Sequence, residues 1–176
     1  MLEKYGDEYV LLGEYVNAQT PTLFEHTPCG FKWKCRPKDI LCKAPCPRCH
    51  SSKGEKKIEK ILKQNCFNYE IQKRFNDLRG LSYDFYLKEL NLLIEFQGEQ
   101  HYKPIEHFGG KEKFLRQLEN DEKKRQYAEK NGYTLLEIKY TDINNIEDIL
   151  FDFIAQRLKI QSELNDRRPK KDEEIV

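Results

Sequence analysis

The sequence "LNLLIEFQGEQHY" (residues 90–102) has the composition of a buried strand that is interrupted by polar side chains. Successive side chains of a strand point to opposite faces of the sheet. Alternation therefore gives this stretch an apolar face and a face that carries an acid and an amide. The apolar face consists of Leu92, Ile94 and Phe96, and the other face carries Leu93, Glu95 and Gln97. The preceding "LSYDFYL" (residues 81–87) alternates as well, and the short connection "KEL" predicts a hairpin.

The hairpin places two acids opposite each other. If Leu87 pairs with Leu92 around the turn, Asp84 faces Glu95, while Tyr83 shares the core face with Leu87. Directly opposed side chains have Cβ atoms about 4.5–5.5 Å apart, and like charges at such positions destabilise a sheet. A divalent cation would compensate, since hard oxygen ligands suit Mg²⁺. The alternative is a solvated outer face, which the helices expected on both sides of the sheet disfavour.

The rest of the chain predicts two domains and a tail. Residues 1–50 are expected to form a small cysteine-rich module, with a strand over 8–17 and a hairpin after it. Residues 51–164 are expected to form a mixed sheet flanked by helices, and residues 165–176 a disordered charged tail. Periodicity predicts helices over 54–65, 111–132 and 145–164, and strands over 68–75, 81–87, 91–97 and 133–140. The second domain therefore has the order α-β-β-β-α-β-α.

Five of the six cysteines lie between Cys29 and Cys49. Without a secretory segment, this clustering favours a metal site in a reducing compartment over a disulfide framework. The pairs His26-x2-Cys29 and Cys46-x2-Cys49 predict a structural, tetrahedral zinc site, with small buried thiols as the alternative. Cys35 or Cys42 could replace His26, and His50 is a weaker competitor. Cys66, far from this group, is expected to be a core thiol.

Charge is unevenly distributed along a chain whose formal net charge is only +1. Residues 28–60 contain ten Lys or Arg and three acids, a local net charge of +7. Such a patch is the expected footprint of a phosphate-binding surface, with a solvated face as the alternative. The residues expected to grip a nucleic-acid backbone are Lys32, Lys34, Arg36, Lys38 and Arg48. The chain shows no membrane-spanning run and no signal peptide, which predicts an intracellular, cytoplasmic location.

One acid lies on a helix stripe that should face the core. Phe114 and Leu118 mark the apolar stripe of the helix expected over 111–132, and Asp121 continues it at i+3. An acid on such a stripe is unusual unless it is paired.

Asp84, ten intervening residues and Glu95-x-Gln97, in an α-β-β-β-α-β order, resemble the core of PD-(D/E)xK nucleases. The fuller pattern from "SKGEKKI" to "LLEIKY" resembles phage- and virus-borne homing-type endonucleases related to the very-short-patch repair nuclease, which often carry small zinc modules. The resemblance covers roughly residues 8 to 150. It implies a restriction-endonuclease-like fold and Mg²⁺-dependent hydrolysis of phosphodiester bonds in double-stranded DNA.

The resemblance also implies roles for single residues. Asp84 and Glu95 would hold Mg²⁺, and Gln97 stands where the family has its lysine. This is a departure, because an amide is neither a cation nor a base, although it could orient a water molecule. The further catalytic candidates are His101 as general acid or base, Asp121, which would complete the site or hold His101, and Glu55 near the metal. Structural alternatives are a surface histidine at 101 and a solvated helix face at 55.

Three functions follow from this sequence. The first is a metal-dependent DNA endonuclease of the homing or very-short-patch type, in which Lys124 pairs with Asp121 or touches phosphate. The second is a non-catalytic, zinc-dependent DNA-binding protein on a decayed nuclease fold, which Gln97 keeps open. The third is a repair nickase. The recognition sequence and the oligomeric state do not follow from the residues.

Overall fold

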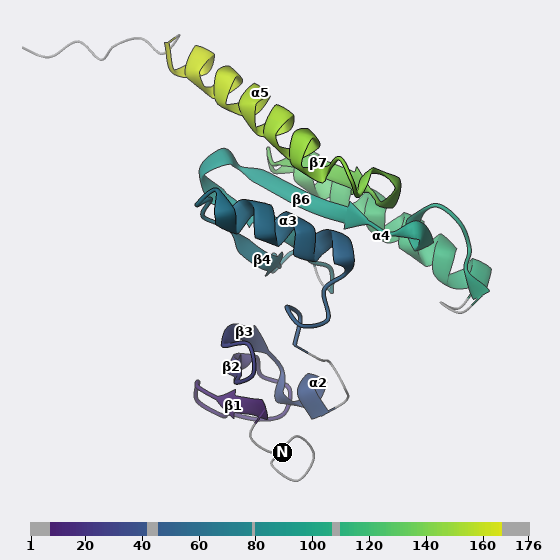
Figure 1. Ribbon diagram of the computed structural model, residues 1–176. Coiled ribbons are helices and arrows are strands. Elements are labelled where there is room, and N and C mark those ends of the chain that lie inside the picture. Colours follow the sequence, from purple (N-terminus) through teal and green to yellow (C-terminus); the bar gives the residue numbers. More distant parts are fainter. Residues whose placement is uncertain (1–7, 42–45, 79, 107–109, 167–176) are drawn as a thin grey trace, which may run out of the picture. The chain divides into compact units, whose positions relative to one another are not determined.

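The computed structural model describes residues 8–41, 46–78, 80–106 and 110–166 (Figure 1). The chain divides into two compact units, Met1–Ser52 and Lys53–Val176, and this division lies close to the boundary expected after residue 50. The tail expected over 165–176 falls mostly outside the described residues, as does Cys42, one of the expected alternatives to His26. None of the described helices combines the length and the apolar character needed to cross a bilayer.

The first unit is built on a three-stranded antiparallel sheet. Its strands β1 (Tyr9–Leu11), β2 (Thr22–His26) and β3 (Phe31–Cys35) lie in the order β1-β2-β3. The hairpin of β2 and β3 is confirmed, with Phe24 opposite Trp33, and the helix α2 (Pro37–Leu41) follows it. The strand expected over 8–17 is much shorter than predicted: it ends at Leu11, where the chain turns and the backbone N–H of Leu12 donates to the carbonyl of Leu23.

The second unit has the predicted order of elements around one mixed sheet. Strands β4 (Glu70–Lys73), β5 (Tyr83–Leu87) and β6 (Leu92–Gln97) are antiparallel, and β7 (Thr134–Lys139) lies parallel to β6. The helices are α3 (Lys53–Gln64), α4 (Gly110–Lys130) and α5 (Ile146–Asp166). Parallel neighbours need a long crossover, and α4 supplies it. Gly132 ends that crossover with a φ of 70°, as expected of a residue after a helix C-cap.

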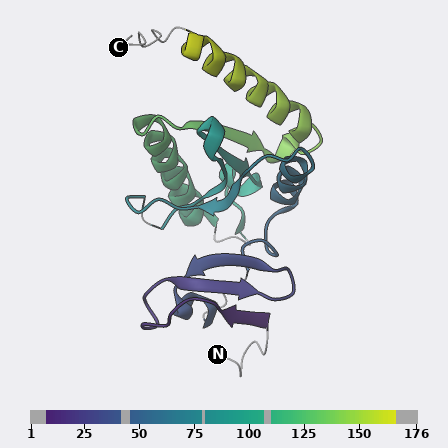
Figure 2. The same ribbon diagram turned by 90° about the vertical axis from the view of Figure 1, so that its left-hand side faces the viewer.

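Helices cover both faces of this sheet, so that its central strand β6 is buried. Figure 2 shows α4 on one side of the sheet and α3 on the other. Leu92, Leu93 and Ile94 have no exposed surface. The core under α3 and α5 includes Ile58, Leu62, Phe85, Ile94, Ile138 and Leu150. The core under α4 includes Leu78, Tyr83, Tyr86, Leu93 and Ala128. The chain is therefore a mixed α/β protein with two sheets.

The hairpin register is confirmed: Leu87 pairs with Leu92, and Phe85 pairs with Ile94. The prediction that Tyr83 shares a face with Phe85 and Leu87 is wrong. Tyr83 packs in the core under α4, where its hydroxyl donates to the carbonyl of Lys124 at 2.7 Å. The alternation fails because the β5–β6 pairing stops at Phe85, and β5 diverges from β6 beyond that point.

Two other predictions of burial are also wrong. Cys66 is exposed, because it lies in the turn after α3 with a φ of 56°. Leu118 is 40% exposed, and Phe114 is only partly buried. The first half of α4 thus projects past the sheet, and Asp121 and Ala128 are the buried residues of this helix.

Candidate functional site

Four side chains in the first unit converge on one point. His26 ends β2, Cys29 lies in the turn that follows, and Cys46 and Cys49 belong to a second turn. Their ligand atoms all lie within 4.8 Å of one another. His26 Nδ1 is 3.2 Å from Cys29 Sγ and 3.5 Å from Cys49 Sγ, and the sulfurs of Cys29 and Cys46 are 3.6 Å apart. Tetrahedral zinc at about 2.3 Å from sulfur requires separations of this size, so these residues could hold a metal ion.

The ionisation of the three thiols is unequal. Burial raises the pKa of Cys49 to about 12, and burial also raises the pKa of Cys46. Burial opposes ionisation of Cys29 as well, but hydrogen bonds, the largest from His26, outweigh it and lower its pKa to about 7. A bound dication would let all three thiols ionise. Among the described residues, Cys35 and His50 lie outside this cluster.

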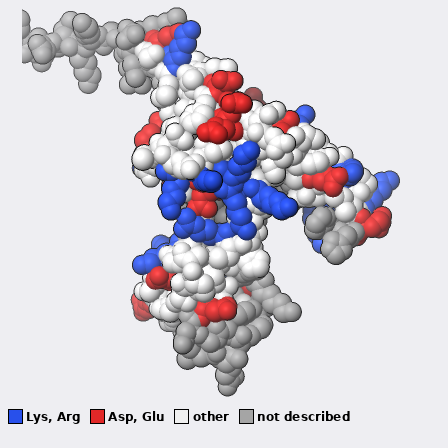
Figure 3. Space-filling model, in the orientation of Figure 1, with Lys and Arg blue, Asp and Glu red and all other residues white. Residues whose placement is uncertain are grey.

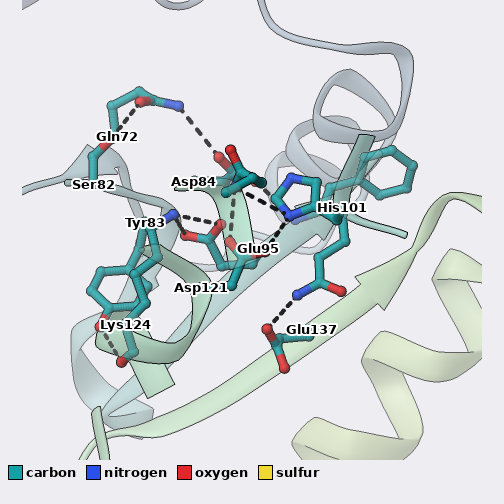
Figure 4. Close-up of polar contacts among 12 residues, drawn as sticks. Gln72, Ser82, Tyr83, Asp84, Glu95, His101, Asp121, Lys124 and Glu137 are labelled. Carbon is teal, nitrogen blue, oxygen red and sulfur yellow. Dashed lines mark hydrogen bonds and ion pairs between the residues drawn. The ribbon is translucent and has the colours of Figure 1, made fainter. Parts of the chain in front are cut away.

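The second unit brings Asp84 and Glu95 together where β5 and β6 separate. Residues 83 and 84 continue β5 beyond Phe85, the last residue of this strand that pairs with β6. There the backbone N–H of Phe96 donates to Asp84 Oδ2 at 2.8 Å, so a carboxylate occupies the place of a backbone acceptor. Glu95 is only 5% exposed, which excludes the solvated outer face. The predicted pair of acids thus sits at a fork in the sheet (Figure 4).

The charges at this fork are not balanced by the protein alone. Burial raises the pKa of Asp84 well above its usual range, and the negative charges of Glu95 and Glu55 raise it further. Burial also raises the pKa of Glu95, although Lys124 counteracts it. Glu55, on the first turn of α3, therefore belongs electrostatically to the same cluster. Carboxylates that repel one another in a buried place favour a bound cation.

Lys124 reaches the fork from α4. Its Nζ donates to both carboxylate oxygens of Glu95 at 2.9 Å and lies 5.6 Å from the ring centroid of Tyr83. The side chain is 13% exposed. The structure thus pairs Lys124 with Glu95, where the sequence predicted a pair with Asp121 or a phosphate contact. Alternation along one strand could not reveal an amine that arrives from the neighbouring helix.

His101 and Asp121 form a second pair beside the fork. His101 Nδ1 lies 2.7 Å from Asp121 Oδ2, and Asp121 is 4% exposed. Gln117, one turn earlier on α4, donates to Asp121 Oδ1 at 2.8 Å. Asp121 thus contacts His101, as one of its two expected roles requires, and its charge also raises the pKa of Glu95. Gln117 was missed, although its i−4 spacing from Asp121 places it on the same helix face.

Gln97 is engaged away from the carboxylates. Its amide nitrogen donates to Glu137 on β7, and its amide oxygen accepts from the hydroxyl of Tyr102. Arg125 Nε also donates to Glu137, at 2.9 and 3.1 Å from the two oxygens. Gln97 therefore joins a structural network between β6, β7 and α4. The expectation that its amide stands in for the family lysine at the metal does not match these contacts.

The basic residues of the first unit differ in their surroundings. Arg36 pairs with Asp39 at 2.9 Å, and Lys32 lies 3.5 Å from Glu25. Arg48 Cζ lies 6.0 Å from the ring centroid of Phe31. Lys34 is exposed and Lys38 is partly buried. The positive charge of this unit is thus partly neutralised by its own acids.

The chain is similar to two viral proteins whose names state no function. It is 36% identical over 97 residues, 54% of the chain, to "Uncharacterized protein 094L" of Frog virus 3 (isolate Goorha). It is 41% identical over 74 residues, 42% of the chain, to "Uncharacterized protein 307L" of Invertebrate iridescent virus 6. These matches span 58% and 37% of the two relatives. No protein-family model matches the chain, and no solved structure matches it significantly.

Proposed function

We propose that this chain is a metal-dependent endonuclease that hydrolyses phosphodiester bonds of double-stranded DNA. The supporting observation is the convergence of Asp84 and Glu95 at the fork between β5 and β6, with Glu55 in electrostatic range. The order α3-β4-β5-β6-α4-β7 agrees with a restriction-endonuclease-like core. Together with the resemblance of the motifs, these features support an enzyme of the homing or very-short-patch repair type.

Asp84 and Glu95 fit a hard divalent cation such as Mg²⁺. Both offer carboxylate oxygens, which Mg²⁺ prefers, and the raised pKa of each acid reflects negative charge gathered in a buried place. Glu55 is a third acid whose charge acts on Asp84. When bound, Mg²⁺ would supply Lewis-acid polarisation of a phosphate and acidify a water molecule.

His101 is the proposed general acid or base. Asp121 engages Nδ1 at 2.7 Å and fixes the orientation of the ring, so Nε2 is the nitrogen through which His101 exchanges a proton. Gln117 holds the other oxygen of Asp121. This chain of contacts from α4 keeps a proton-transfer group beside the carboxylates.

Lys124 supplies the positive charge that Gln97, at the position of the family lysine, does not have. In the family pattern an amine follows the second acid on the same strand, whereas here the amine comes from α4 and bonds Glu95 from the side. Its charge counteracts the effect of burial on the pKa of Glu95, and its two hydrogen bonds orient the carboxylate. A cation held by Glu95 would replace the amine of Lys124, which could then contact a phosphate oxygen.

The zinc site and its surroundings would support DNA binding rather than chemistry. All four of its ligands come from the protein, which is typical of structural zinc. In this proposal the metal folds the first unit, and Lys34, Lys38 and Arg48, with Lys32 and Arg36 beside their acids, contact the DNA backbone.

Plasmid cleavage with Mg²⁺ tests this proposal. We expect the wild-type chain to nick or linearise supercoiled DNA, and Asp84→Asn and Glu95→Gln to lower the rate by more than about 100-fold, beyond the range of supporting residues. Glu89→Gln, an exposed acid in the turn of the same hairpin, is the matched control and should retain activity. Nicked and linear products distinguish a nickase from a double-strand endonuclease.

A second candidate function, a non-catalytic DNA-binding protein, is favoured by one observation. Both oxygens of Glu95 are bonded by Lys124, and Gln97 is held by Glu137 and Tyr102. A wild-type chain that binds DNA but leaves a diverse set of substrates intact with Mg²⁺ would support this function and contradict the nuclease.

A further inference from the structure

Four lysines form a stripe along α3, the first helix of the second unit. Lys53, Lys56, Lys60 and Lys63 follow an i, i+3, i+7, i+10 spacing. At 3.6 residues per turn they fall within an arc of about 80° on the helix surface. All four are exposed. The opposite side of the helix buries Ile58, Ile61 and Leu62 in the core, so the stripe faces away from the core of the second unit.

The charges on this stripe are not neutralised by neighbouring acids. Across the ranges that the structure describes, none of the four amines takes part in an ion pair, whereas Arg36, Lys103, Arg116 and Arg125 each pair with an acid. Of the acids on the same helix, Glu59 accepts from the Tyr69 hydroxyl at 3.2 Å, and the charge of Glu55 raises the pKa of Asp84. Figure 3 shows Lys and Arg side chains gathered over α3.

The stripe begins at the carboxylate cluster. Gly54 packs so closely on Phe96 that a Cβ at residue 54 would lie 2.2 Å from the end of the ring. Phe96 is the residue whose N–H holds Asp84. The N-terminal turn of α3 is thereby fixed at the fork. From Lys53 to Lys63 the helix rises about 15 Å, the length of about four base pairs of duplex.

We propose that this lysine stripe (Lys53, Lys56, Lys60 and Lys63) binds the phosphate backbone of duplex DNA on one side of the bond to be cleaved. The inference rests on the proposed function, which places the scissile phosphate at Asp84 and Glu95. A backbone held at the fork continues along α3 and meets one amine per helical turn. Because these contacts are made to phosphates, they position the duplex without reading its sequence.

Binding of a labelled random-sequence duplex, measured by fluorescence anisotropy with Mg²⁺ omitted, tests the stripe. The variant Lys53→Gln/Lys56→Gln/Lys60→Gln/Lys63→Gln should bind about tenfold or more weakly at moderate salt. The slope of log affinity against log salt should fall by about 0.9 for each lost phosphate contact. The matched control changes four exposed lysines of α4 in the same way and should retain most of the affinity and slope. These lysines are Lys111, Lys113, Lys123 and Lys130.

The outcomes separate this inference from the proposed function. Equal affinity of the stripe variant and the wild type, or an equal loss in both quadruple variants, overturns the stripe as a specific surface. So does a wild-type chain that binds no duplex at low salt. If the stripe variant alone loses affinity but the wild type never cleaves with Mg²⁺, the surface is supported and the hydrolytic function fails. Unchanged circular dichroism confirms that the exposed substitutions leave the fold intact.

Discussion

The two candidate metal sites of this chain differ in almost every property that a metal site can have. The site in the first unit draws His26, Cys29, Cys46 and Cys49 from two tight turns and closes around one point. The site in the second unit draws oxygens from β5, β6 and α3 and an amine from α4. The first uses the ligands of structural zinc, with no position left for substrate. The second gathers acids whose burial and mutual repulsion oppose their ionisation, which is costly for folding.

Loss of the site in the first unit (the closed site: His26, Cys29, Cys46 and Cys49) should have the largest effect on metal content and folding. Cys46→Ser should reduce the zinc content from one equivalent to well below one and unfold the first unit, because binding of structural zinc contributes on the order of 10 kcal/mol of folding energy. Metal analysis and backbone amide NMR spectra check both effects. The second unit should keep its spectrum.

The control for this prediction is Cys35→Ser. Cys35 is partly buried in β3 but lies outside the cluster, so this variant should keep its zinc. Loss of zinc from Cys35→Ser with retention in a His26→Ala variant would show that the sequence alternative for the fourth ligand is correct.

In the site of the second unit (the open site, around Asp84 and Glu95), substitution of His101 should change the rate of cleavage rather than the stability of the fold. His101→Ala should slow cleavage by about 10²–10⁴-fold, the usual contribution of a positioned general acid or base. Asp121→Asn should cause a smaller loss, since the ring keeps a partner but loses a fixed charge. Single-turnover rates between pH 5 and 8 check this, and the remaining activity of His101→Ala should depend less on pH. Equal rates in wild type and His101→Ala would assign the histidine a structural role.

The sequence predicted the closed site more completely than the open one, and the reason is distance along the chain. His26 and Cys29, like Cys46 and Cys49, lie three residues apart. This spacing alone predicts that each pair presents its two ligands from one tight turn. Alternation and a short turn similarly gave the register in which Leu87 pairs with Leu92 and Phe85 with Ile94. These are local rules, and they were sufficient for the order of helices and strands.

What the sequence could not predict depends on contacts between distant elements. Lys124 lies 29 residues from Glu95, and Gln97 lies 40 residues from Glu137. The position of α4 over the sheet decides both contacts. Tyr83 was assigned to the wrong face because strict alternation assumes a continuous ladder, and the ladder ends where the fork begins. Local rules thus failed at the candidate active site, where the fold departs from regular geometry.

Substitution of Lys124 tests whether its amine offsets the negative charge of Glu95 in the open site. Lys124→Met should lower the free energy of unfolding by about 3 kcal/mol without metal, because it leaves the buried Glu95 unpaired. Added Mg²⁺ should recover part of this loss, since a cation replaces the amine. Urea denaturation with and without Mg²⁺ measures both. Lys123→Met, at the exposed neighbouring position, should change stability by no more than about 0.5 kcal/mol. An Mg²⁺-independent loss in Lys124→Met would contradict a cation site at Glu95.

Asp84→Asn should stabilise the metal-free protein at neutral pH. Burial and two neighbouring acids raise the pKa of Asp84 well above its ordinary value near 3.8. Above pH 4 the unfolded chain has therefore lost a proton that the folded chain retains, and stability falls as pH rises towards the raised pKa. Asn removes this penalty and can still accept the Phe96 N–H. We expect a gain of about 1–2 kcal/mol, typical of relieved active-site strain.

The pH dependence distinguishes this effect from a general change in charge. The advantage of Asp84→Asn over wild type should grow in metal-free denaturation as the pH rises from about 4 towards the raised pKa of Asp84. Asp152→Asn, an exposed acid on α5, should show no such trend. An advantage that is constant with pH, or a net destabilisation, would mean that the carboxylate is tolerated at the fork without cost.

The smallest effect on catalysis should come from Gln97, although it occupies the position of the family lysine. Gln97→Met preserves the volume but removes the hydrogen bonds to Glu137 and Tyr102. Glu137 keeps Arg125, so the loss of stability should be no more than about 1 kcal/mol. Plasmid cleavage should stay within about threefold of wild type, because the amide points into the network between β6 and β7. A loss of more than about 100-fold with unchanged stability would place Gln97 at the reacting phosphate, and the open site would then extend along β6 beyond the fork.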